Sequence, residues 1–207
     1  MTAAAAAIPR RSRQHAGQHR TSARQHTGQR GTTLLEVLVT MLIVTFGLLG
    51  LGGMQMRLQL SDVESYQRAQ ALALLDDMAN RMAANRDKAA TYVTGAASPV
   101  GAGMTCPMTS ATVEQTDTAQ WCEALQGAAE RVGNSKAGAA VGARGCVESM
   151  GTNQYLITVA WQGMTPISAP PAPVACGAGL YSTAGSACAD DRCRRVVTTV
   201  LNIATLN

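Results

Sequence analysis

The feature that most constrains this 207-residue chain is an apolar stretch near its N-terminus. No charged residue lies between Val37 and Met54, a stretch that is about 27 Å long as an α-helix. The hydrocarbon core of a bilayer is about 30 Å thick. A buried core helix of a soluble domain is the alternative, but such helices are usually shorter and carry a polar stripe. We therefore interpret residues 32–56 as a membrane-spanning helix.

One carboxylate, Glu36, lies at the start of this apolar stretch. An ionised carboxylate near the end of a membrane helix is costly unless it is paired or reaches the interface. Glu36 therefore either reaches the lipid headgroups or pairs with a cation from a partner.

The segment that precedes the helix carries all of the chain's excess positive charge. Residues 1–31 hold six arginines and no acid, whereas residues 32–207 hold 11 Lys and Arg against 13 Asp and Glu, a net charge of −2. A nucleic-acid partner thus has no support, and the positive segment is expected to hold the N-terminus in the cytoplasm. Its polar, aperiodic composition predicts a disordered basic leader over residues 1–31.

The three histidines, His15, His19 and His26, all lie in this leader. If the leader is removed, histidine-based acid–base catalysis, Ser-His and Cys-His nucleophile pairs and Cys/His zinc sites are excluded. No acidic motif of the kind that supports acid–base catalysis is recognised after the apolar stretch. We therefore predict a protein that is not an enzyme, with no catalytic residues, no cofactor and no metal.

After Met56 the pattern becomes amphipathic, because apolar residues recur at intervals of three or four: Leu72, Leu75, Ala79 and Met82. This pattern predicts that the helix continues over residues 57–94 and packs on a globular head. Gly95 and Pro99 are the stop signals. A second helix is predicted over Thr112–Gly133, with Trp121 in the core and an N-cap at Thr112, Thr116 or Asp117.

The last third of the chain has the period of β-strands. Cys146–Ser149 and Tyr155–Trp161 predict a hairpin around residues 151–153, with alternate residues on one face: Tyr155, Ile157, Val159 and Trp161. Arg195–Ile203 predicts a third strand. We expect an α+β fold in which a three-strand antiparallel sheet and an irregular loop over 163–192 form a head at residues 95–207, packed on the long helix.

Six cysteines lie beyond the apolar stretch, none in a CxxC pair: Cys106, Cys122, Cys146, Cys176, Cys188 and Cys193. An even number in an exported domain predicts disulfides, whereas metal and redox sites favour closer pairs. Free buried cysteines are the alternative. Among 15 connectivities we expect Cys176–Cys188 to close the loop, Cys146–Cys193 to join the first and third strands, and Cys106–Cys122 to fix the second helix.

The residues Gly31-Thr32-Thr33-Leu34-Leu35-Glu36 resemble the processing site of type IV prepilins, in which Gly precedes the cut and Glu is the fifth residue of the mature chain. The resemblance implies that a prepilin peptidase cuts after Gly31 and that the new N-terminus, Thr32, is methylated. The family usually has Phe at the Thr32 position. It also implies that Glu36 pairs with the N-terminal amine of a neighbouring subunit.

The run from Ser65 to Arg86, with its YQR, DM, RM and NR elements, is similar to the PilV group of minor pilins. That resemblance implies a type IV pilin-like fold and a subunit that primes pilus assembly at the pilus tip. Its partners would be other minor and major pilins and a PilY-type tip adhesin. It would sit in the inner membrane with a periplasmic head before assembly. The plain account of any single residue in the run is a solvated position on an amphipathic helix.

Two other functions remain open. A type II secretion pseudopilin shares the processing site and the long helix. A membrane-anchored periplasmic enzyme or binding protein would require a catalytic or binding constellation beyond the apolar stretch, which the sequence does not offer.

Overall fold

The computed structural model describes residues 31, 33–108, 111–128, 131–133, 135–136, 138 and 140–204. The predicted leader, apart from Gly31, and the predicted new N-terminus Thr32 lie outside these residues. The chain divides into two compact units, Met1–Gly47 and Leu48–Asn207, and each is described by itself. The described part of the first unit is helical from Leu34 onward. The second unit contains the sheet and the remaining helices.

The long helix α1 spans Leu34–Ala84. Thr33 caps its start, since the Glu36 backbone N–H donates to Thr33 Oγ1 at 3.3 Å. The predicted helical end at residue 94 is wrong for the α-helix, because Asn85 leaves the helical conformation and the chain tightens into the 3-10 helix η1, Arg86–Tyr92. This tighter turn buries the side chains of Ala89 and Tyr92.

The second helix α2 spans Val113–Leu125 and resolves the N-cap in favour of Thr112, whose side chain accepts from the Gln115 backbone N–H. The prediction that this helix continues to Gly133 is wrong. Gly127 has a φ of 85°, and the N–H groups of residues 127 and 128 donate to the carbonyls of residues 124 and 123. This pattern is the Schellman motif that ends a helix. The short strands β2 (Arg131–Val132) and β3 (Ser135–Lys136) then pair as a separate hairpin.

The main sheet is antiparallel and has the strand order β1-β4-β5-β6. Its members are β1 (Val100–Gly101), β4 (Arg144–Gly151), β5 (Gln154–Gln162) and β6 (Arg194–Asn202). The predicted hairpin and third strand are confirmed to within a few residues. The expectation of three strands is corrected to four, because the two-residue strand β1 adds an edge and is too short to show a strand period.

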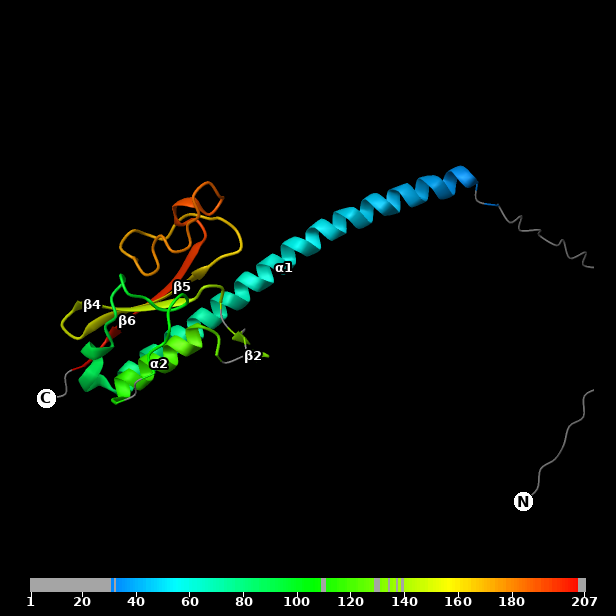
Figure 1. Ribbon diagram of the computed structural model, residues 1–207. Helices are drawn as coiled ribbons and strands as arrows, with labels where there is room; N and C mark the ends of the chain where they lie inside the picture. Colours follow the sequence, from blue (N-terminus) through cyan, green and yellow to red (C-terminus); the bar gives the residue numbers. More distant parts are fainter. Residues whose placement is uncertain are drawn as a thin grey trace, which may run out of the picture. The chain divides into compact units, whose positions relative to one another are not determined.

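The two faces of the sheet carry separate cores. Tyr155, Ile157, Val159 and Trp161 of β5 are buried with the apolar side chains of α1, as the alternation predicted. Figure 1 shows α2 beside the C-terminal part of α1, where it contributes to this core. Buried on the opposite face are four residues from β4, β5 and the loop after β5: Cys146, Ala160, Cys176 and Tyr181. Strand β5 is therefore covered on both sides.

Trp121 joins three elements of the helix-side core. Its side chain is fully buried, which confirms the predicted core role. The indole Nε1–H donates to the Leu74 carbonyl of α1 at 2.8 Å. The ring also lies directly over Gly145 of β4, where a Cβ atom would come within 2.1 Å of it. Gly145 thus provides the space that lets α2 pack against the sheet.

Three disulfides form, and no cysteine is left free. The predicted Cys106–Cys122 bond is confirmed. The other two pairings are wrong, since the structure joins Cys146 to Cys176 and Cys188 to Cys193. Strand β5 lies between β4 and β6, so those strands are about 9 to 10 Å apart, beyond the Cα separation of about 4.4 to 6.8 Å that a disulfide spans.

Candidate functional site

The first candidate feature is the apolar surface of α1. Every large apolar side chain from Leu34 to Val63 is at least 40% exposed. The described part of the chain contains one helix that is long and apolar enough to cross a membrane. A continuous apolar surface of this kind requires a cover, because soluble domains rarely expose large apolar patches. A membrane anchor and a signal sequence both have this property.

The predicted processing and assembly residues lie at the start of this helix. Gly31 is exposed and outside the helix, and Glu36 is exposed in the first turn of α1. The Glu36 carboxylate makes no hydrogen bond or ion pair with any other residue that the structure describes. The negative charge is favourably placed at the helix N-terminus. Its predicted pairing with a second chain stays a prediction.

Arg81, in the run from Ser65 to Arg86, holds α2 in place through polar contacts. The Arg81 guanidinium donates to Asp77 of α1 at 2.9 Å and to Asp117 and Gln120 of α2 at 2.9 and 2.7 Å. The other Asp117 oxygen accepts from the Tyr92 hydroxyl at 2.5 Å. The plain account of the run predicted that charges such as Arg81 and Asp77 are solvated, but these two side chains form ion pairs. They position α2 against α1.

Burial, together with the hydrogen bond to the Asp117 carboxylate, raises the pKa of Tyr92 to about 12. The Tyr92 hydroxyl thus stays protonated and donates throughout the neutral range. Asn85 donates to the same hydroxyl oxygen at 3.2 Å. Asn85, Tyr92 and Asp117 thus form a hydrogen-bonded network that connects η1 to α2 and has a structural role.

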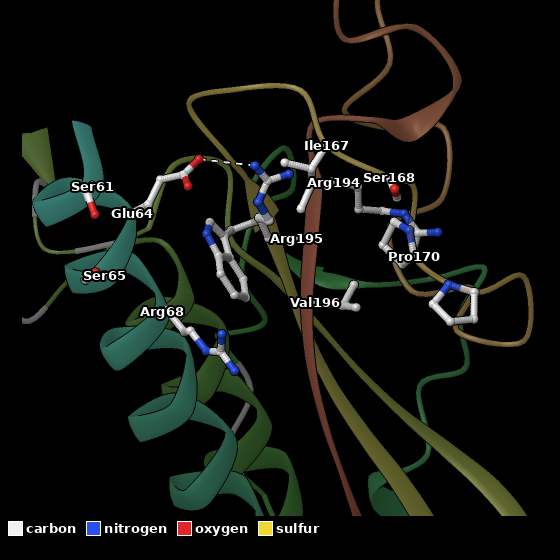
Figure 2. Close-up of a pocket in the computed structure, with 12 residues that line it drawn as sticks. Ser61, Glu64, Ser65, Arg68, Ile167, Ser168, Pro170, Arg194, Arg195 and Val196 are labelled. Carbon is white, nitrogen blue, oxygen red and sulfur yellow. Dashed lines mark hydrogen bonds and ion pairs between the residues drawn. The ribbon is translucent and has the colours of Figure 1, made fainter. Parts of the chain in front are cut away.

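A second polar cluster joins α1 to β6 and to the loop after β5. Glu64 Oε1 accepts from Arg195 Nη2 at 3.1 Å and from the backbone N–H groups of Met164 and Thr165 at 3.1 and 3.3 Å. Arg195 Nη2 also donates to the Thr165 carbonyl at 2.6 Å. The Glu64–Arg195 pair therefore bridges α1 and β6 and fixes the loop after β5 (Figure 2). The sequence offered no signal for this pair, whose members are 131 residues apart.

Beside this pair lies a groove with a volume of about 470 Å³, here called the α1–β6 groove. Its walls come from α1, from Trp161 at the end of β5, from the start of β6 and from the loop after β5. Figure 2 shows Arg68 projecting from α1 toward the strands. The side chains that line the groove include one carboxylate and three guanidinium groups: Glu64, Arg68, Arg194 and Arg195.

Across the residues that are described, no group of three or more His, Cys, Asp or Glu side chains is placed to hold a metal ion. The six predicted cysteines are all engaged in disulfides. Comparison of the chain with protein-family models, with curated proteins and with solved structures finds no match.

Proposed function

We propose that this protein is a minor pilin of a type IV pilus, a structural subunit that helps to prime pilus assembly and belongs to the tip complex. The observation that carries the proposal is the exposed apolar part of α1, preceded by Gly31 and Glu36 and followed by a disulfide-containing α+β head. A subunit that must pass from a membrane into a helical assembly needs an apolar surface that lipid and then neighbouring helices can cover.

In this proposal Gly31 and Thr32 define the cleavage site, and Glu36 acts in assembly. Cleavage gives Thr32 a free α-amine. In an assembled helix bundle this cation can approach the Glu36 carboxylate of an adjacent subunit, where burial between helices would make an unpaired charge costly. The pair would favour one axial position of a subunit relative to its neighbour. The partners would be other pilins, the prepilin peptidase and a PilY-type adhesin.

Processing is the direct test of the proposal. In cells with an active prepilin peptidase, intact-mass spectrometry of the membrane-extracted protein should find a chain that begins at Thr32. Gly31→Leu should retain residues 1–31, because the peptidase must approach the backbone at this position and a bulky side chain would block that approach. Uncleaved wild-type protein in such cells would contradict the proposal, and cleavage elsewhere would contradict the assignment of Gly31.

Glu36→Ala should leave membrane insertion and cleavage intact but lower the recovery of partner pilins in crosslinking and co-purification several-fold. The substitution makes the apolar segment more apolar, so insertion does not suffer. Glu36→Asp keeps the charge and should be partly tolerated. If crosslinking of Glu36→Ala stays at the wild-type level, this carboxylate acts by reaching the headgroups and not by pairing.

Co-purification also distinguishes the proposal from a pseudopilin. A minor pilin should be recovered with pilins, whereas a pseudopilin should be recovered with components of a secretion system.

A further inference from the structure

The α1–β6 groove has the size of a small-molecule site. Such sites have volumes of about 300 to 1,000 Å³, and this groove has about 470 Å³. It lies wholly within the unit Leu48–Asn207. The Glu64–Arg195 pair and the buried Arg194 give it a fixed frame, because Arg194 donates to Asp191 and to the carbonyls of Val174 and Cys176.

One charge in the groove has no partner among the residues that the structure describes. Glu64 and Arg195 neutralise each other, and Arg194 is paired with Asp191. Arg68 makes no hydrogen bond or ion pair with any residue that the structure describes, although it lines the groove (Figure 2). A guanidinium group presents several N–H donors in a planar fork that matches a carboxylate. The groove therefore offers an anchor for an anion.

The neutral walls add donors that make no hydrogen bond with the described part of the chain. Trp161 is only 4% exposed and lines the groove, yet its indole N–H donates to no acceptor among the described residues. The indole nitrogen is not among the fully buried polar atoms that lack a partner, so this N–H group is accessible and can donate to a ligand with an acceptor. Ser61, Ser65 and Ser168 contribute hydroxyl groups that can both donate and accept. Apolar surface comes from the loop residues Ile167 and Pro170.

We infer that the α1–β6 groove binds a sugar acid, a small ligand that combines one carboxylate with several hydroxyl groups. Arg68 would hold the carboxylate through paired hydrogen bonds. The indole N–H of Trp161 and the serine hydroxyls would bind the ring hydroxyls, and the apolar loop residues would contact the C–H groups of the ring. The inference goes beyond the pilin proposal and does not depend on it, since neither cleavage nor assembly enters the binding.

The test is titration calorimetry on the full chain in detergent micelles at constant ionic strength. The probes are glucuronate, galacturonate and N-acetylneuraminate, with glucose as the neutral sugar and acetate as the bare carboxylate. At least one sugar acid should bind saturably and about tenfold or more tightly than glucose and acetate, because only the acid engages both Arg68 and the hydroxyl-bearing wall. Equal binding of acetate would reduce the groove to a simple anion site and overturn the inference.

Two variants with the same charge change assign the site. Arg68→Gln should weaken binding of the sugar acid about tenfold or more, whereas Arg86→Gln, at an exposed position outside the groove, should leave it unchanged. Arg68 makes no described polar contact within the fold, so its variant should keep the wild-type circular dichroism spectrum. The inference fails if none of the three acids binds, or if Arg68→Gln binds as the Arg86→Gln control does.

Discussion

Gly145→Ala should lower the free energy of unfolding by about 3 kcal/mol or more. The added Cβ would lie 2.1 Å from Cη2 of Trp121 and 2.6 Å from two further ring atoms. The ring cannot move aside easily, because it is fully buried and its Nε1–H is bound to the Leu74 carbonyl of α1. Forcing extra volume into a packed core typically costs 1 to 3 kcal/mol, and a displaced indole would also lose its hydrogen bond.

Urea unfolding of the full chain in detergent, followed by circular dichroism, measures this effect. Gly53→Ala is the matched control, because a Cβ at that exposed helical position meets no atom within 4 Å, and alanine favours helices. Trp121→Leu should make Gly145→Ala less harmful, so the double variant should be more stable than the sum of the two single losses predicts. Additive losses would show that the two residues do not share this contact.

The sequence pattern predicted the helices and strands that are long enough to show a repeating pattern of apolar residues. Alternation along Tyr155–Trp161 predicted the strand and the face that packs on α1, and both are confirmed. The strand β1 has two residues and shows no period. The end of α2 was misplaced because the stop is Gly127, a residue in the left-handed region whose role depends on backbone hydrogen bonds to the last turn.

The residues of the candidate site also differ in whether the sequence alone could predict them. Gly31 and Glu36 form a local motif, so the sequence alone could single them out. Glu64 and Arg195 come together only because β6 returns beside α1. The groove depends on that tertiary pairing, and no local spacing in the sequence predicts it. The two wrong disulfides have the same origin, since pairing depended on which strand lies in the centre of the sheet.

Removal of the Cys146–Cys176 bond should destabilise the head more than removal of Cys188–Cys193. The first bond closes a loop across a sequence separation of 30 residues and the second across 5. Loop-closure entropy then predicts a loss of about 4 kcal/mol for the first and about 2 kcal/mol for the second. The first bond also holds the loop after β5 over the face of the sheet that contains Ala160. There the Tyr181 hydroxyl donates to the Ala160 carbonyl at 3.1 Å.

The comparison uses two double variants, C146A/C176A and C188A/C193A, so that no unpaired thiol remains to form a wrong bond. The urea midpoint of C146A/C176A should be the lower of the two. Hydrogen exchange should rise across residues 163–181 in this variant, because the covering loop then loses its covalent link to β4 and is held by noncovalent contacts, among them the hydrogen bonds of Glu64, Arg194 and Tyr181. An equal or greater loss in C188A/C193A would show that the short loop around η2 (Ala189–Asp191), and not the cross-link to β4, stabilises this face of the sheet.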